Sequence, residues 1–249
     1  MAEYLQEFDA VMKEKEMSGW NSKFLATDNI NVENVRKEEY LNPSKHIEYI
    51  CNEHGYRDDA WPENLDDVVW CLGDSITLGV GQPFNETWPQ VLQKRINKRC
   101  LNISMLGASN DSLSMKAEFI KKYYNPKTII IMWGLFSRRR VDGKDVQHDR
   151  SDFGLDADLK NFAENFNQTE NGGADIHHFL LSHACPDFGT MKTTSLHYLL
   201  SKTNLISDNL LKKLTIIEQN DYARDNVHFG EGSSQLVCDL VEGKLSNRL

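Results

Sequence analysis

Apolar positions after residue 65 gather into short, nearly continuous runs, each followed closely by a turn rich in glycine or hydroxyl residues. Three such runs are "DVVWCLG" at 67–73, "RCLNIS" at 99–104 and "TIIIMWG" at 128–134. A short apolar run of this kind is typical of a strand that is buried on both faces of a parallel sheet. The pattern therefore predicts three strands in this part of the chain.

Between these runs, apolar residues recur every three or four positions, which is the spacing of an amphipathic helix. In "ETWPQVLQKRIN" at 86–97, Thr87 can cap a helix, Pro89 fits its first turn, and Gln90 completes the spacing of a capping box. In "SNDSLSMKAEFIKKYY" at 109–124, caps are available from Ser109 to Asp111. We therefore expect a helix after each of the first two strands.

Strands that alternate with helices predict an α/β domain built on a doubly wound parallel sheet. In such sheets, ligand sites lie outside the carboxyl ends of the strands. Ser75, Gly107 and Gly134 each follow a predicted strand, so the sequence places all three at the same edge of the sheet.

The remaining chain is harder to interpret. We expect a helix in "LKNFAENFNQ" (159–168), a strand in "IHHFLLSHAC" (176–185), a helix in "SLHYLLSKTNL" (195–205) and a last strand in "KKLTIIEQ" (212–219). Residues 1–64 are rich in Glu, Lys and Asn, with a candidate helix near residues 2–16. We interpret 1–64 as an N-terminal extension and 65–249 as the main domain.

Composition narrows the class of protein. The 249 residues are 40% hydrophobic, enough to fill a core, and they carry 28 Lys and Arg against 37 Asp and Glu. The net charge of −9 repels phosphate backbones and argues against a nucleic-acid partner. No uninterrupted apolar stretch predicts a secretory signal or a membrane span, so we expect a cytoplasmic protein. Five widely spaced cysteines suit buried, reduced thiols.

Ser75 lies in "CLGDSITLGVG" (71–81), either as part of an ordinary turn or as a nucleophile presented at a strand end. A serine hydroxyl needs a base to accept its proton, and that base needs a partner that fixes its tautomer. Of the eight histidines, we single out His228, because "DNVH" places Asp225 three residues before it. Asp74 is expected to serve the hydrogen bonds of its own turn.

"GDSIT" (73–77), followed far downstream by "DNVHFGEGSS" (225–234), resembles the GDSL or SGNH hydrolase family of esterases and lipases. Four blocks define that family and supply Ser, Gly, Asn and His. Ser75 matches the nucleophile of the first block, Gly107 in "NISMLGAS" matches the oxyanion glycine of the second, and Asp225 with His228 match the fourth. The resemblance covers residues 66–134 and 221–240.

The resemblance implies a flavodoxin-like sheet and hydrolysis of acyl or acetyl esters, of small molecules or carbohydrates, with no cofactor. It also implies an oxyanion hole made by the backbone N–H groups of Ser75 and Gly107 and by an asparagine side chain. That asparagine belongs to a Gly-x-Asn-Asp block after the third strand. Here "WGLFSRRR" places Phe136 at the asparagine position, or Leu135 if the register shifts by one.

Neither Leu135 nor Phe136 can donate a side-chain hydrogen bond, and a missing oxyanion donor costs on the order of 10²- to 10³-fold in rate. Asn110 or one of Arg138 to Arg140 could supply the donor instead, and Asn110 and Arg138 are expected at the rim of the site. Without such a substitute, Phe136→Asn or Leu135→Asn is expected to raise kcat. The departure leaves open an alternative: an SGNH-fold binding or structural protein with a weakened site.

Three further groups of residues have competing interpretations. "IMWGLFSRR" is similar to the variant third block of SGNH-like proteins encoded by tailed phages, which would allow a virion protein with virion or oligomer partners. The residues Arg138 to Arg140 could clamp an anionic substrate, but a solvated run that pairs with the excess acids is favoured. His177, His178, His183 and Cys185 are metal-ligand types without a recognised spacing, so no metal is predicted.

Overall fold

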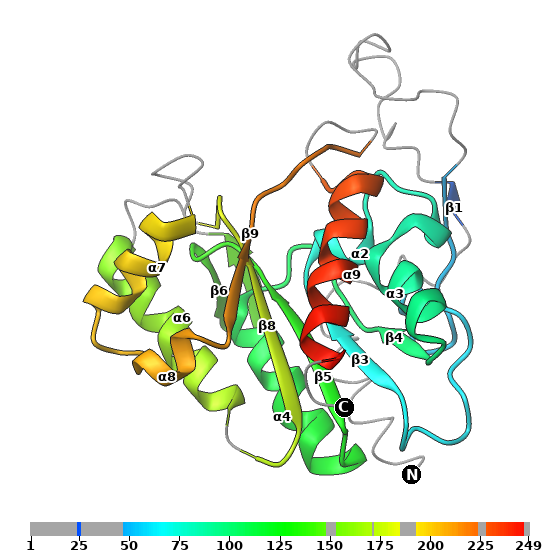
Figure 1. Ribbon diagram of the computed structural model, residues 1–249, viewed down its shortest axis with the longest axis horizontal. Coiled ribbons are helices and arrows are strands. Elements are labelled where there is room, and N and C mark those ends of the chain that lie inside the picture. The colour runs from blue at the N-terminus through cyan, green and yellow to red at the C-terminus, as the bar shows by residue number, and fades with distance from the viewer. Residues whose placement is uncertain are drawn as a thin grey trace, which may run out of the picture.

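The computed structural model describes residues 24–25, 47–147, 153–170, 172–184, 193–223 and 228–246 (Figure 1). The expected helix near residues 2–16 lies outside the described residues, and so do Cys185 and Asp225. Within the described part of the chain, no helix is both long enough and apolar enough to cross a membrane.

A five-stranded parallel sheet forms the centre of the protein (Figure 1). Its strands are β3 (Val69–Leu72), β4 (Cys100–Asn102), β5 (Thr128–Trp133), β8 (Asp175–Leu181) and β9 (Leu214–Ile217). They lie in the order β4-β3-β5-β8-β9, and each neighbouring pair is parallel. The first strand of the sheet therefore lies between the second and the third, which is the flavodoxin-like order. The predicted doubly wound α/β sheet is confirmed.

Helices cover both faces of the sheet. One face packs against α4 (Asn110–Tyr124), α6 (Leu155–Thr169) and α7 (Thr193–Lys202), and the other packs against α3 (Trp88–Ile96) and α9 (Glu231–Ser246). Burial of the strands on both sides explains their near-continuous apolar sequences, since neither face meets water. Short helices α2 (Ser75–Leu78), η3 (Phe84–Glu86) and α8 (Asp208–Leu211) lie in the connections.

The two predicted helix starts differ in their capping. Ser109 caps α4 as expected, because its Oγ accepts a hydrogen bond from the backbone N–H of Ser112 at 3.2 Å. Thr87 does precede α3, but its hydroxyl donates to the carbonyl of Phe84 at 2.9 Å instead of capping the helix. Gln90 donates to the buried carboxylate of Asp58 at 3.3 Å. The predicted capping box at α3 is therefore wrong, although the helix begins where expected.

A hairpin of β6 (Arg138–Val141) and β7 (Lys144–Gln147) follows β5 and was not predicted. Its two-residue turn is Asp142-Gly143, with φ of 48° and 78°. Asp-Gly is a preferred pair for such turns because both central residues need positive φ. The charged strands "RRRV" and "KDVQ" lack the apolar alternation that would have revealed them.

The described part of the N-terminal extension packs against the main domain. Arg57 is buried, and its guanidinium donates to the carbonyls of Leu78, the last residue of α2, and of Gly79 and Gln82 just beyond it. Asp58 pairs with Arg99 at 2.8 Å, and although Arg99 lowers the pKa of Asp58, burial dominates and raises it to about 6. The segment around residue 57 therefore holds the end of α2 in place.

A polar chain crosses the apolar interior beside β8. The indole of Trp133 donates to Nδ1 of His178 at 3.1 Å, and Nε2 of His178 lies 2.7 Å from Glu170, which also pairs with Lys213. Burial lowers the pKa of His178 and fits a neutral ring that donates from Nε2. Burial raises the pKa of Glu170, but hydrogen bonds from His178 and Lys213 outweigh it and lower that pKa to about 2.

Glu170→Gln is expected to destabilise the protein at pH 7 by about 1–3 kcal/mol. The folded pKa of Glu170 lies below the unfolded value of 4.5, so its contribution is present above pH 4.5 and declines as the pH falls towards about 2. The difference in unfolding free energy between wild type and variant should therefore shrink between pH 5 and pH 3. Glu164→Gln, at an exposed carboxylate of the same helix, is the control. If the difference in unfolding free energy between wild type and Glu170→Gln stayed constant with pH, the assigned role of Glu170 would be wrong.

Candidate active site

The topological switch point of the sheet lies between β3 and β5. From β3 the chain continues to β4 on one side, whereas β5 lies on the other side of β3. Open α/β sheets bind ligands in the crevice outside the carboxyl ends of strands at such a point. Ser75 follows β3 and Gly134 follows β5, so both lie at this crevice.

The local sequence explains how Ser75 is held at the start of α2. A Cβ atom on Gly73 would lie 2.0 Å from Oγ1 of Thr77, so only glycine fits before the turn. Asp74 caps α2, because its Oδ1 accepts a hydrogen bond from the backbone N–H of Ile76 at 3.0 Å. The expected role of Asp74 in its own turn is thus confirmed. Ser75 itself is only 5% exposed.

Three loops meet at Gly134. A Cβ atom added there would lie 3.1 Å from the carbonyl oxygen of Ala108, 3.6 Å from Oδ2 of Asp74 and 3.7 Å from Oδ1 of Asn110. Ala108 lies in the loop after β4, Asp74 follows β3, Asn110 begins α4 at the end of the loop after β4, and Gly134 lies in the loop after β5. The segments that carry Ser75 and Gly107 therefore approach Gly134 within the width of one side chain.

Gly107 and Asn110 shape the loop after β4 in different ways. Gly107 has a φ of +69° in the turn closed by the hydrogen bond from Ala108 N to Met105 O, a conformation that favours glycine. Asn110 is fully buried: its Oδ1 accepts from the N–H of Gly134 at 3.0 Å, and its Nδ2 donates to the carbonyl of Leu135 at 3.4 Å. Asn110 thus fixes the loop after β5, whereas the sequence placed it at an open rim.

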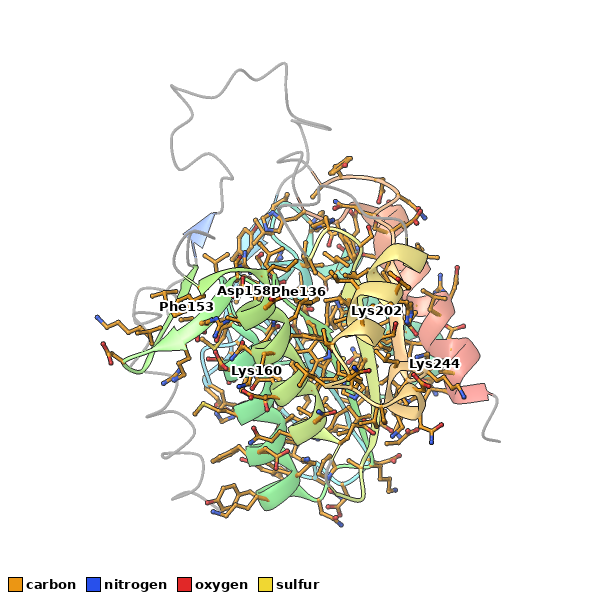
Figure 2. The ribbon with its side chains drawn as sticks, turned by 90° about the vertical axis from the view of Figure 1, so that its left-hand side faces the viewer. Phe136, Phe153, Asp158, Lys160, Lys202 and Lys244 are labelled. Atoms are coloured by element: carbon orange, nitrogen blue, oxygen red, sulfur yellow. The ribbon has the colours of Figure 1, made fainter. Side chains whose placement is uncertain are left out.

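Phe136 is a core residue. Its side chain, labelled in Figure 2, is 1% exposed. The centroid of its ring lies 4.7 Å from that of Phe162 in α6. Its backbone N–H donates to the carbonyl of Ala184 at 2.9 Å. The position at which the sequence resemblance expects an asparagine therefore contributes to packing, and Phe136→Asn would place a polar amide in the core.

The guanidinium groups of Arg138 and Arg139 pair with acids, as the favoured interpretation expected, but these side chains are only 15% and 16% exposed and are therefore not solvated. Arg138 donates to Oδ2 of Asp74 at 2.5 Å, and Arg139 donates to Asp158 of α6 at 2.8 Å. The backbone N–H of Arg140 donates to Asp111 at 2.7 Å. Arg138 differs from the other two because its partner is the residue directly before Ser75.

His228 lies between β9 and α9. Its carbonyl accepts hydrogen bonds from the N–H of Ala223 at 2.8 Å and from Nε2 of Gln219 at 2.9 Å. Gln82, shortly after α2, donates to Ser234 in the first turns of α9 at 3.1 Å, so this segment returns to the side of the sheet where Ser75 lies (Figure 1). No hydrogen bond joins Ser75 to His228 among the residues that the structure describes.

His183 is a residue of this edge that the sequence interpretation did not assign to the site. It follows β8, and its neighbour Ala184 holds the backbone of Phe136. Burial lowers the pKa of His183 and outweighs the carboxylate of Asp74, which raises it. His178 uses both ring nitrogens in the interior, as described above. Within the described residues, no three His, Cys, Asp or Glu side chains gather as a metal site would require.

Among the described cysteines, Cys71, Cys100 and Cys238 are buried free thiols, as expected, and Cys51 is a half-buried one. Burial raises the pKa of Cys238 to about 12. The Cys238 thiol is therefore unreactive near neutral pH, and Cys71, Cys100 and Cys238 belong to the core.

No protein-family model matches the chain, and no curated protein matches it. Among solved structures, the psychrotrophic esterase EstA from Pseudoalteromonas sp. is 16% identical, with a TM-score of 0.48 over 73% of this chain and 98% of that one. TesA is 17% identical, with a TM-score of 0.48 over 73% and 99%. A family two carbohydrate esterase from Clostridium thermocellum is 14% identical, with a TM-score of 0.48 over 76% and 66%. Likeness of this degree carries no argument about activity.

Proposed function

We propose that the protein is a serine ester hydrolase of the SGNH type, which cleaves acyl or acetyl esters through an acyl-enzyme. The observation that carries the proposal is the meeting of the loops after β3, β4 and β5 at Gly134, beside the turn that presents Ser75. The matching residues of the first, second and fourth blocks, Ser75, Gly107 and Asp225 with His228, support it.

In the proposed reaction, Ser75 Oγ attacks the ester carbonyl carbon while His228 accepts the hydroxyl proton. The carbonyl electron pair moves onto its oxygen, which receives hydrogen bonds from the backbone N–H groups of Ser75 and Gly107. Collapse of this intermediate breaks the ester C–O bond, and His228 returns the proton to the departing alcohol. Water then opens the acyl-enzyme by the same steps, and Asp225 orients His228 throughout.

The test is hydrolysis of a neutral aryl acetate by wild type and by His228→Ala. We expect the variant to lose about 10³- to 10⁴-fold in kcat, because removing the general base leaves only binding and oxyanion stabilisation. His197→Ala, on α7, is the matched control and should keep wild-type activity. Equal turnover by wild type and His228→Ala, well above the background rate, would show that another group acts as the base.

The alternative function is a binding or structural protein of the same fold, for instance a virion component. Burial of Phe136 in the core favours this alternative, since the third block offers no asparagine donor. It predicts ester hydrolysis at the background rate in wild type and in His228→Ala alike.

A further inference from the structure

The turn after β5 brings Arg138 back to the site. The N–H of Arg138 donates to the carbonyl of Leu135 at 3.1 Å, which closes a tight turn over residues 135–138. Phe136 lies inside this turn, and its ring packs in the core against Phe162. Two residues later the chain starts β6, and the side chain of Arg138 reaches Asp74.

The guanidinium of Arg138 is held by the residue next to the nucleophile. Its Nη1 lies 2.5 Å from Oδ2 of Asp74, whose other carboxylate oxygen caps the helix that Ser75 begins. The same Oδ2 lies 3.6 Å from the Cβ position of Gly134, where the loops of the site meet. The Arg138 side chain is 15% exposed and the Asp74 side chain 7%, so the pair is largely shielded from water.

The guanidinium of Arg138 has N–H groups that do not bond Asp74. A guanidinium carries five N–H groups in a rigid fork. Within the described residues, Asp74 is the side chain that this guanidinium bonds, so further N–H groups remain for a ligand. Its neighbour Arg139 contrasts with it, because Nε and Nη2 of Arg139 both bond Asp158, and its guanidinium lies 4.6 Å over the Phe153 ring.

We propose that Arg138, oriented by Asp74, supplies the third hydrogen bond to the oxyanion, in place of the asparagine that the third block lacks. This assignment rests on the proposed function. As Ser75 Oγ bonds to the carbonyl carbon, negative charge develops on the carbonyl oxygen, and an N–H of Arg138 donates to it. Arg138 keeps all its protons, and the transferred proton stays with His228. A charged donor in a shielded site stabilises an oxyanion more strongly than a neutral amide does.

The experiment compares wild type, Arg138→Ala, Arg138→Lys and Arg139→Ala on two aryl esters, a neutral acetate and a hemisuccinate with an anionic acyl group. We expect Arg138→Ala to lose about 10²- to 10³-fold in kcat on both esters, with KM changed only a few-fold. Arg138→Lys keeps the charge and the pairing with Asp74 and should fall between. Arg139→Ala disturbs the same hairpin and should keep its kcat.

A second readout is the rate at which a fluorophosphonate labels Ser75, since the phosphonyl oxygen occupies the same hole. That rate should fall in Arg138→Ala in parallel with kcat. If the variants only raise KM for the hemisuccinate, Arg138 instead binds the carboxylate of the substrate, and the proposal is wrong. Unchanged kcat in folded Arg138→Lys and Arg138→Ala would also overturn the proposal. If the fluorophosphonate labels no residue of the wild-type protein, the proposed function itself is refuted. If it labels Ser75 and the Arg138 variants are labelled at the wild-type rate, only this inference is refuted.

Discussion

Ser75→Ala should lower the kcat for aryl ester hydrolysis by about 10⁴-fold or more, to a rate near that of buffer. No other group in the proposed mechanism can form the acyl-enzyme, so the loss should exceed that of any oxyanion donor. The unfolding midpoint should stay close to that of wild type, since Asp74 caps α2 through the Ile76 N–H and not through the serine hydroxyl.

The control for this change is Ser201→Ala, because Ser201 lies on α7 and its hydroxyl bonds the carbonyl of Tyr198 in the same helix. It should hydrolyse the ester as fast as wild type does. If Ser75→Ala kept a tenth or more of the activity, another residue would be the nucleophile, and the interpretation of residues 73–77 would be wrong.

Phe136→Asn should destabilise the protein by about 3–5 kcal/mol, the cost of emptying a buried aromatic site and of placing an amide there. The ring of Phe136 packs against Phe162 and belongs to the core cluster that includes Trp133 and Phe166. Urea denaturation followed by tryptophan fluorescence measures the loss, and kcat per folded molecule should not rise.

Leu135→Asn is the matched control, because Leu135 is half-buried and adjacent. It should cost much less stability than Phe136→Asn. A Phe136→Asn protein as stable as wild type, with a higher kcat, would show that position 136 faces the oxyanion after all.

The sheet could be predicted because its strands are buried on both faces. Continuous apolar runs such as Thr128–Trp133 then leave little ambiguity, and the carboxyl-end rule places Ser75 and Gly134 at one edge. The hairpin of β6 and β7 escaped prediction because its strands are charged and bond residues distant in the sequence, Asp111 in α4 through the Arg140 N–H and Asp158 in α6 through the Arg139 guanidinium. Only the Asp142-Gly143 turn marked it in the sequence.

Part of the local geometry around Ser75 also follows from the sequence. Short motifs identify residues that must sit in special turns, and Gly73 shows why, since any Cβ there meets Thr77. Pairings between distant segments carry no such local mark. Arg138 and Asp74, which bond each other, are 64 positions apart in the sequence. Asn110 bonds two residues of the loop after β5 that lie 24 and 25 positions away from it. Sequence patterns therefore named these residues without showing what each one bonds.

The most direct test of the central claim is reaction of the wild-type protein with a fluorophosphonate, followed by proteolysis and mass spectrometry of the peptides. Only a serine whose proton is removed by a nearby base reacts rapidly with this reagent. The account predicts one phosphonylated residue, Ser75, and loss of that label in both Ser75→Ala and His228→Ala. An unlabelled Ser75 in folded wild-type protein, or a label on another serine, would contradict it.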